Sequence, residues 1–200
     1  ECAVMIVKAK INNINVTAGA FDFAFIGGSV GASEGEAIIY GIQNAIDNKQ
    51  PFILFTASGG MRMFESLIAL SQMTRVTLAV NELKKNNLPY IVVLTDPTAG
   101  GTTASFGMLA DITLAEPGAI VAFAGKRVIQ ATVKEELPPD FQTSEYLREK
   151  CGFIDSVIER KDLKEKIGSI LSILLKIDTS VSSVSNDETT ESNLTAREAS

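Results

Sequence analysis

The chain has 200 residues, of which 46% are apolar, and its formal net charge is −6 at pH 7. This charge argues against a general nucleic-acid-binding surface, because neutralising phosphates requires clustered Lys and Arg. No run approaches the ~18 uninterrupted apolar residues of a membrane-spanning helix. Because the sequence begins with Glu1 rather than Met, we expect it to be a piece of a longer chain.

The first 50 residues are predicted to contain three strands and a helix. Alternating apolar residues predict strands over residues 3–7, 14–17 and 21–26. The spacing then changes to that of a helix, which we expect over residues 33–48.

The rest of the body repeats a short apolar strand followed by a helix. The expected strands cover residues 52–55, 90–94, 112–114, 119–123 and 154–158, and the expected helices cover residues 61–85, 102–109, 144–150 and 162–176, with a short helix near Lys126. Strands that are apolar on both faces indicate a mostly parallel sheet covered by helices. We therefore predict one α/β domain over residues 1–176 and a polar, disordered tail over residues 177–200.

The long helix predicted over residues 61–85 carries apolar side chains on more than one face. Such a helix lies either between two layers of a protein or at a contact between subunits.

Histidine is absent, and the two cysteines, Cys2 and Cys151, form no Cys-x-x-Cys pair. The cysteines therefore indicate neither a disulfide framework nor a zinc site, and a reducing compartment is favoured. Without histidine, any catalysis must use backbone donors or a base that the substrate supplies.

Two glycine pairs, Gly59-Gly60 and Gly100-Gly101, each follow a predicted strand and precede a predicted helix. Glycine allows a sharp turn and the close approach of a ligand, and the N–H groups that open a helix attract negative charge. One such pair is typical of an ordinary tight turn. Two pairs after neighbouring parallel strands predict a joint site for an oxyanion, because ligands collect at the carboxyl ends of such strands.

Two polar residues flank the first glycine pair. Ser58 lacks both a Gly-x-Ser-x-Gly frame and a histidine, so a structural or ligand-orienting role is favoured over a nucleophile. Arg62 either meets an anionic group or forms an exposed ion pair with Glu65, which would contribute only ~0.3–0.5 kcal/mol.

Three further charged residues are candidates for a catalytic or ligand-binding role, and each also has a simpler structural interpretation. Asp96, before a proline, is expected to cap or turn the chain rather than to act as a base. Lys126 and Arg127 follow Ala124-Gly125 and are either phosphate or carboxylate ligands or a solvated basic pair.

Several segments together resemble the β subunit of the bacterial acetyl-CoA carboxylase carboxyltransferase. In chain order they are Phe23-x-Phe25-Ile26-Gly27-Gly28-Ser29, Ser58-Gly59-Gly60-x-Arg62-Met63, Leu88-Pro89-Tyr90, Leu94-Thr95-Asp96-Pro97-Thr98-x-Gly100-Gly101, Ala104-Ser105-Phe106, Ala115-Glu116-Pro117 and Phe123-Ala124-Gly125-x-Arg127-Val128-Ile129. The resemblance covers roughly residues 3–175, and its ordered succession is far more specific than any single motif.

The resemblance implies a crotonase-like fold (ClpP/crotonase), a β-β-α spiral with helices packed on the sheets. It implies transfer of a carboxyl group from carboxybiotin, on a biotin carboxyl carrier protein, to acetyl-CoA, giving malonyl-CoA for fatty acid synthesis. An α-type subunit is the implied partner in an α2β2 assembly within an ATP-dependent complex, in the bacterial cytoplasm or alternatively a plastid.

Site residues carry over from the family by position. The amides of Gly59, Gly60, Gly100 and Gly101 are the implied donors to the enolate or ureido oxygen. The implied substrate-binding residues are Ser58, Arg62, Lys126 and Arg127, with the arginines either contacting CoA phosphates or anchoring the structure.

The sequence also departs from the family. The usual four-cysteine zinc ribbon has no counterpart here, so zinc is expected only if a longer chain supplies the ribbon. Residues 30–35 differ from the usual glycine-rich continuation, Phe64 stands where Gln is common and Lys126 where Pro is common. These differences concern the details of the pocket more than the class of reaction.

Two alternatives stay open at this point. The same fold could serve a malonate or methylmalonyl-CoA decarboxylase or a CoA hydratase, although a hydratase needs two acids or bases and only Glu65 and Asp96 are nearby in sequence. The chain could also be a non-catalytic scaffold, which would bind partners but no acetyl-CoA.

Overall fold

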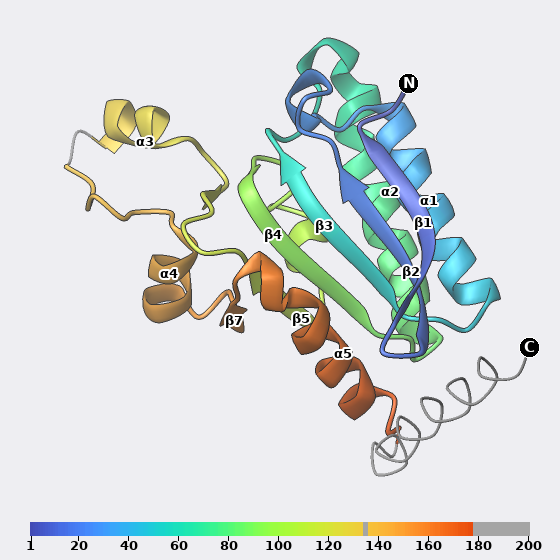
Figure 1. The fold of residues 1–200 in the computed structure, drawn as a ribbon. Coiled ribbons are helices and arrows are strands. Elements are labelled where there is room, and N and C mark those ends of the chain that lie inside the picture. Colours follow the sequence, from blue (N-terminus) through green and yellow to red (C-terminus); the bar gives the residue numbers. More distant parts are fainter. Residues whose placement is uncertain (134–135, 178–200) are drawn as a thin grey trace, which may run out of the picture.

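A computed structural model describes residues 1–133 and 136–177, without the side chains of Arg127 and Val133. One sheet of seven strands forms its centre and carries helices on both faces (Figure 1). The predicted tail over residues 177–200 lies, apart from Ile177, outside the described residues.

The sheet is mostly parallel, as the sequence predicts. Its strands are β1 (Val4–Ile11), β2 (Ile14–Phe21), β3 (Phe52–Ser58), β4 (Tyr90–Ala99), β5 (Ile112–Ala115), β6 (Val121–Ala122) and β7 (Ser156–Val157). They lie in the order β1-β2-β3-β4-β5-β7, with β6 paired to β4. Only the pair β1–β2 is antiparallel among these, and the other pairs are parallel.

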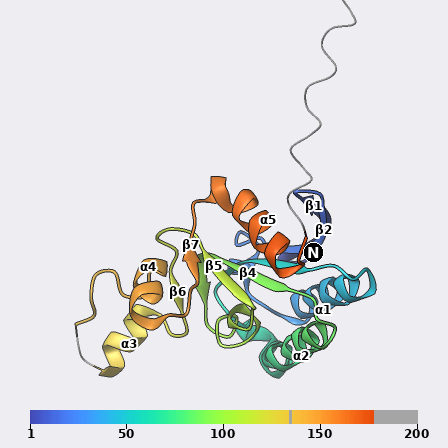
Figure 2. The same cartoon turned by 90° about the horizontal axis from the view of Figure 1, so that it is seen from below.

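The helices lie on the two faces of the sheet and beyond its edge. They are α1 (Ala32–Asp47), α2 (Ser66–Lys85), α3 (Lys126–Val133), α4 (Ser144–Tyr146) and α5 (Leu163–Leu174), with 3-10 turns at Ile26–Gly28, Met63–Glu65, Phe106–Met108 and Arg160–Asp162 and a π turn at Leu147–Cys151. Figure 2 shows α1 and α2 on one face and α5 on the other.

Two hydrophobic cores result from this arrangement, because successive residues of a strand point to opposite faces. On the face of α1 and α2, Leu54 and Val92 pack with Ile38 of α1. On the face of α5, Ile53 and Val93 pack with other buried apolar residues of the chain. The near-continuous apolar runs of β3 and β4 therefore reflect burial on both faces.

The strand predicted over residues 21–26 is wrong beyond Phe21. The side chain of Asp22 accepts a hydrogen bond from the Ala24 N–H at 2.9 Å, and its carbonyl accepts one from the Phe25 N–H at 3.3 Å. This local turn competes successfully with strand pairing, as Asp side chains commonly do. The chain then enters the 3-10 turn Ile26–Gly28.

Three other predicted helices differ from the structure in type or in where they begin. The helix expected over residues 102–109 is a series of turns ending in the 3-10 turn Phe106–Met108, and the helix expected over residues 144–150 is α4 followed by a π turn. The long helix begins at Ser66 rather than near Met61, after the 3-10 turn Met63–Glu65.

Only one side of α2 is covered within the described residues. Ala69, Val76 and Val80 are buried, whereas Leu67 and Leu70 are 76% and 54% exposed. The expectation that α2 lies between two layers is therefore wrong for the described part of the chain. The alternative, a contact with another subunit, stays a prediction. None of the described helices combines the length and the apolar character needed to span a bilayer.

The buried Tyr90 hydroxyl provides a test of the core. It donates a hydrogen bond to the Phe106 carbonyl at 2.9 Å, and burial raises the pKa of this hydroxyl. We expect Tyr90→Phe to lower the free energy of unfolding by about 1–2 kcal/mol, because the Phe106 carbonyl then keeps only the long hydrogen bond from the Leu109 N–H, at 3.5 Å. Urea denaturation measures the change. Tyr40→Phe is the control, since Tyr40 is 63% exposed, and an equal loss in both variants would contradict the assignment.

Candidate functional site

The two glycine turns lie side by side at the carboxyl ends of β3 and β4. These strands pair in parallel, with Ser58 opposite Thr98. A Cβ atom placed on Gly60 would lie 3.2 Å from both the Cα of Gly100 and the nitrogen of Gly101. Backbone therefore packs directly on backbone, and the two turns meet as their places after neighbouring parallel strands predict.

Glycine is required at Gly60 and Gly100 by conformation as well as by space. Their φ angles are 109° and 63°, in a region that residues with a Cβ rarely adopt. A side chain at either position would strain the turn and separate it from its neighbour.

Three of the four predicted amide donors are already paired within the protein. The Gly59 N–H donates to the Gly27 carbonyl at 2.9 Å, the Gly60 N–H to the Ser58 Oγ at 3.1 Å, and the Gly100 N–H to the Ala122 carbonyl at 3.0 Å. The expectation that all four are unpaired is wrong, because the segment before α1, Ser58 of β3 and β6 each supply an acceptor. Among the described residues, the Gly101 N–H meets no acceptor.

Sequence reasoning missed the amide of Met61. Met61 forms a parallel bridge with Val30, in which the Val30 N–H donates to the Gly60 carbonyl and the Arg62 N–H donates to the Val30 carbonyl, both at 2.8 Å. In such a bridge the central residue directs its own N–H away from its partner. The described residues offer the Met61 N–H no acceptor. Its place directly after Gly59-Gly60 was the signal that could have identified it.

Met61 also lies next to Gly101. A Cβ on Gly101 would come within 2.6 Å of the Met61 Cγ and 3.0 Å of the Met73 Sδ. The two amides without acceptors therefore belong to residues in contact, one from each turn. Two such donors are the arrangement that stabilises an oxyanion.

Hydroxyl groups join the two strand ends beneath the glycines. The Ser58 Oγ lies 2.9 Å from the Thr102 Oγ1, and the Thr56 Oγ1 lies 3.0 Å from the Thr98 Oγ1. Ser58 is fully buried and also accepts from Gly60. Its observed contacts hold the turns together rather than face a ligand.

The Arg62 side chain is buried in an ionic network. One Nη donates to Glu34 and the other to Glu65, each at 2.8 Å, and the guanidinium also donates to the Ser29 Oγ and carbonyl. Arg62 is 5% exposed, so the exposed ion pair with Glu65 expected from the sequence is wrong about exposure. The sequence left two roles open for Arg62, contact with CoA phosphates and anchoring of the structure. The observed contacts fit the anchoring role.

The Glu34 carboxylate is the centre of negative charge in this network. Burial opposes its charged form, but hydrogen bonds from the Ala3 N–H, from Arg62 and from the Gly31 N–H outweigh burial and lower its pKa from 4.5 to about 2. Hydrogen bonds from the Ala32 N–H and from Arg62 lower the pKa of Glu65 as well. Both carboxylates therefore stay charged at neutral pH.

The remaining predicted residues lie apart from the glycine turns. The Asp96 carboxylate accepts a hydrogen bond from the Ile120 N–H at 2.9 Å. This contact joins two segments that are distant in sequence, and differs from the local cap or turn expected for Asp96. Lys126 and Arg127 begin α3, which lies away from the sheet in both views (Figures 1 and 2). The Lys126 Nζ donates to the Pro138 carbonyl at 3.1 Å.

A family of known proteins matches most of the chain. The carboxyl transferase domain matches residues 10–144. The chain is 64% identical over 200 residues to the acetyl-coenzyme A carboxylase carboxyl transferase subunit beta of Pelagibacter ubique, covering all of this chain and 64% of that protein. It is 53% identical over 173 residues to the protein of the same name from Caulobacter vibrioides, covering 86% of this chain and 56% of that one. The chain thus spans less than two thirds of the relatives it matches.

Solved structures share the crotonase fold of this α/β chain. Transcarboxylase 12S with methylmalonyl-coenzyme A bound has a TM-score of 0.77 and 27% identity, over 85% of this chain and 33% of that chain. The Pseudomonas malonate decarboxylase MdcD–MdcE hetero-dimer has a TM-score of 0.75 and 19% identity, over 86% of this chain and 78% of that chain.

The Glu34 network predicts a loss of stability in acid. Because the folded-state pKa of Glu34 is about 2, below its ordinary 4.5, its contribution is present above pH 4.5 and is lost as the pH falls toward 2. We expect Glu34→Gln to lower the free energy of unfolding at pH 7 by about 3 kcal/mol, and this difference to shrink below pH 4.5.

Urea denaturation at pH 7, 4.5 and 3 measures this effect. The control is Glu36→Gln, an exposed carboxyl in the same helix, which should change stability by less than about 0.5 kcal/mol. A pH-independent difference between Glu34→Gln and the unchanged protein would show that the charge of Glu34 is not what stabilises the fold.

Proposed function

The chain belongs to the carboxyl transferase domain family, and from this premise we propose that it is the acyl-CoA-binding part of a biotin-dependent acetyl-CoA carboxylase carboxyltransferase. Its product is malonyl-CoA, the precursor for fatty acid synthesis. The observation that carries the proposal is the contact between two glycine turns whose Met61 and Gly101 amides have no acceptor within the described residues. The names of the bacterial relatives support the choice of acetyl-CoA.

The proposed reaction moves a carboxyl group from a biotin ring nitrogen to the methyl carbon of acetyl-CoA. The N–C bond to the carboxyl breaks, a C–C bond forms at the methyl carbon, and the methyl proton passes to the biotin nitrogen. Carboxybiotin on a separate carrier protein would supply the activated carboxyl, and its ring nitrogen would take up this proton. A chain without histidine therefore needs no side-chain base of its own.

This chain's part is to stabilise charge on the thioester oxygen. As the methyl C–H bond breaks, negative charge develops on that oxygen, and the N–H groups of Met61 and Gly101 donate to it. Donors fixed in place by the surrounding backbone need no reorganisation during the reaction, which is the source of their effect on rate. In this proposal the Met61 and Gly101 amides, which meet no acceptor among the described residues, bind the oxygen, and the paired amides of Gly59, Gly60 and Gly100 hold the turns in position.

The side chains take supporting roles in this proposal. Ser58 joins the two turns through Thr102, and Arg62 anchors the segment after the first turn. Lys126 and Arg127 are placed near the start of α3, where positive charge can attract the phosphates of CoA.

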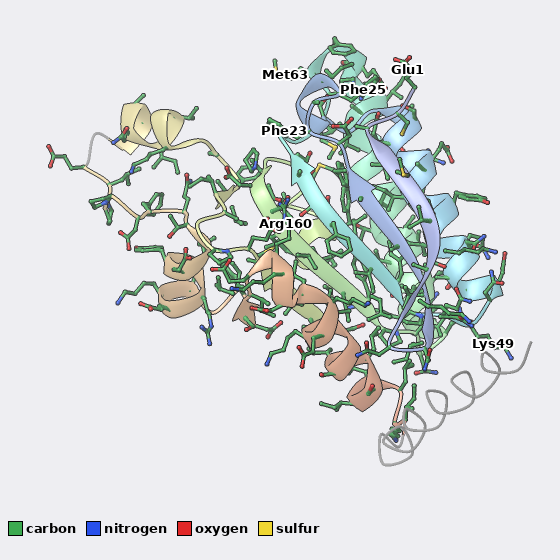
Figure 3. All side chains as sticks on the ribbon, viewed as in Figure 1. Glu1, Phe23, Phe25, Lys49, Met63 and Arg160 are labelled. Atoms are coloured by element: carbon green, nitrogen blue, oxygen red, sulfur yellow. The ribbon has the colours of Figure 1, made fainter. Side chains whose placement is uncertain are left out.

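We also propose an α-type subunit and a biotin carboxyl carrier protein as partners. Apolar side chains gather beside the first turn, where Figure 3 shows Phe23, Phe25 and Met63 at the same end of the molecule. Met63 is 91% exposed, and Phe64 and Leu67 are 73% and 76% exposed. Exposed apolar surface of this kind marks contacts with other proteins. An α2β2 assembly would cover it.

The amide of Gly101 gives the sharpest test. Gly101→Pro removes the N–H, whereas Gly101→Ala keeps it, and both add a Cβ against Met61. We expect the proline variant to be about 10²–10³-fold slower than the alanine variant, the usual cost of losing one oxyanion donor. The assay uses the complete subunit with its α-type partner, malonyl-CoA and biocytin, and follows the formation of acetyl-CoA.

Equal rates in the two variants would remove the Gly101 amide from the mechanism. Loss of the carboxyl from malonyl-CoA without biocytin would indicate a decarboxylase instead. Calorimetric titration with acetyl-CoA separates both enzymes from a scaffold, which should release no heat of binding.

A further inference from the structure

The backbone around Met61 is held on one side by the segment Ser29–Gly31. Two hydrogen bonds of 2.8 Å join Val30 to Gly60 and to Arg62, one on each side of Met61. Val30 is fully buried. The direction of the Met61 N–H therefore depends on where this segment lies.

The Arg62 side chain fixes the same segment a second time. Its Nε donates to the Ser29 Oγ at 3.2 Å and an Nη donates to the Ser29 carbonyl at 2.8 Å. The same guanidinium is held by Glu34 of α1 and by Glu65 of the 3-10 turn, each at 2.8 Å. The planar guanidinium of Arg62 thus connects the segment before α1, the first turn of α1 and the 3-10 turn that precedes α2.

We infer that Arg62 is a positioning residue that orients the Met61 amide for the reacting oxygen, rather than a ligand for the phosphates of CoA. The inference rests on the proposed function and assigns this residue a place in it. The guanidinium acts through Ser29 and Val30, and it is too enclosed to reach a phosphate, since it is 5% exposed and four of its contacts are to this chain.

The shape of the guanidinium matters as much as its charge. Its fork donates to Ser29, Glu34 and Glu65 at once, in fixed directions. A lysine keeps the positive charge beside the two carboxylates, but its three N–H donors start from one nitrogen and cannot reproduce contacts that Arg62 makes from three separate nitrogens. Arg62→Lys therefore loosens the segment while avoiding an unpaired buried carboxylate.

The test measures kcat and KM of Arg62→Lys in the complete enzyme with its α-type partner, using malonyl-CoA and biocytin. We expect kcat to fall about tenfold, because a small misplacement of a catalytic donor has effects of this size or larger. KM for malonyl-CoA should stay within about twofold, since no contact with CoA is lost. Arg75→Lys is the matched control, an exposed arginine of α2 paired with Glu36.

Thermal unfolding of each complex separates positioning from stability. A kcat per folded enzyme within about twofold of the unchanged protein would overturn the inference, as would a rise of KM with kcat unchanged, which is the signature of lost ligand binding. If Arg62→Lys does not assemble with its partner, Ser29→Ala tests the inference instead. This variant removes only the hydroxyl that accepts the hydrogen bond from the Arg62 Nε. That variant should lower kcat about threefold, and an unchanged kcat would contradict the inference.

A readout without catalysis keeps this inference separate from the proposed function. Amide hydrogen exchange of the segment that contains Met61 should be faster in Arg62→Lys than in Arg75→Lys. If the unchanged enzyme transfers no carboxyl group, the proposed function fails. The rates of amide hydrogen exchange still show whether Arg62 positions the segment that contains Met61. Equal exchange in the two variants would overturn it.

Discussion

The close packing of two peptide turns is the constraint on which this site depends. Gly60 and Gly100 approach each other until a single Cβ would touch backbone, and both have φ angles that favour glycine. Parallel pairing of β3 and β4 brings the turns together, because the carboxyl ends of neighbouring parallel strands lie at the same edge of a sheet. What the site presents to a ligand is therefore main chain, with side chains acting as its support.

The pattern of hydrogen bonds divides this main chain into structural and available donors. Amides that donate to Gly27, Ser58 and Ala122 keep the turns in place, whereas the amides of Met61 and Gly101 meet no acceptor in the part of the chain that the structure describes. Buried N–H groups in proteins are almost always paired. Met61 and Gly101 are only partly buried, so their N–H groups, which meet no acceptor among the described residues, are open to water or to a substrate oxygen.

The sequence predicted the larger features of the fold because they depend on local pattern. Apolar runs such as Ile53 and Leu54 identified buried parallel strands, and helical spacing identified α1. The segment after Phe21 was misjudged because its alternation of apolar residues is the same in a strand and in a turn fixed by Asp22. The pairing of individual amides was also out of reach, since the carbonyls of Gly27 and Ala122 are brought to the glycines only by the tertiary fold. The burial of Arg62 has the same origin, because its second carboxylate, Glu34, comes from another helix.

Locating the thioester oxygen in a complex tests whether the Met61 and Gly101 amides are the donors. A crystal structure of the complete enzyme with a non-reactive acetyl-CoA analogue would place this oxygen relative to the backbone. We expect this oxygen to lie about 2.7–3.1 Å from the nitrogens of both Met61 and Gly101, while the hydrogen bonds of Gly59, Gly60 and Gly100 to their protein acceptors are kept. An oxygen that contacts neither nitrogen, or that binds away from the two glycine turns, would contradict it.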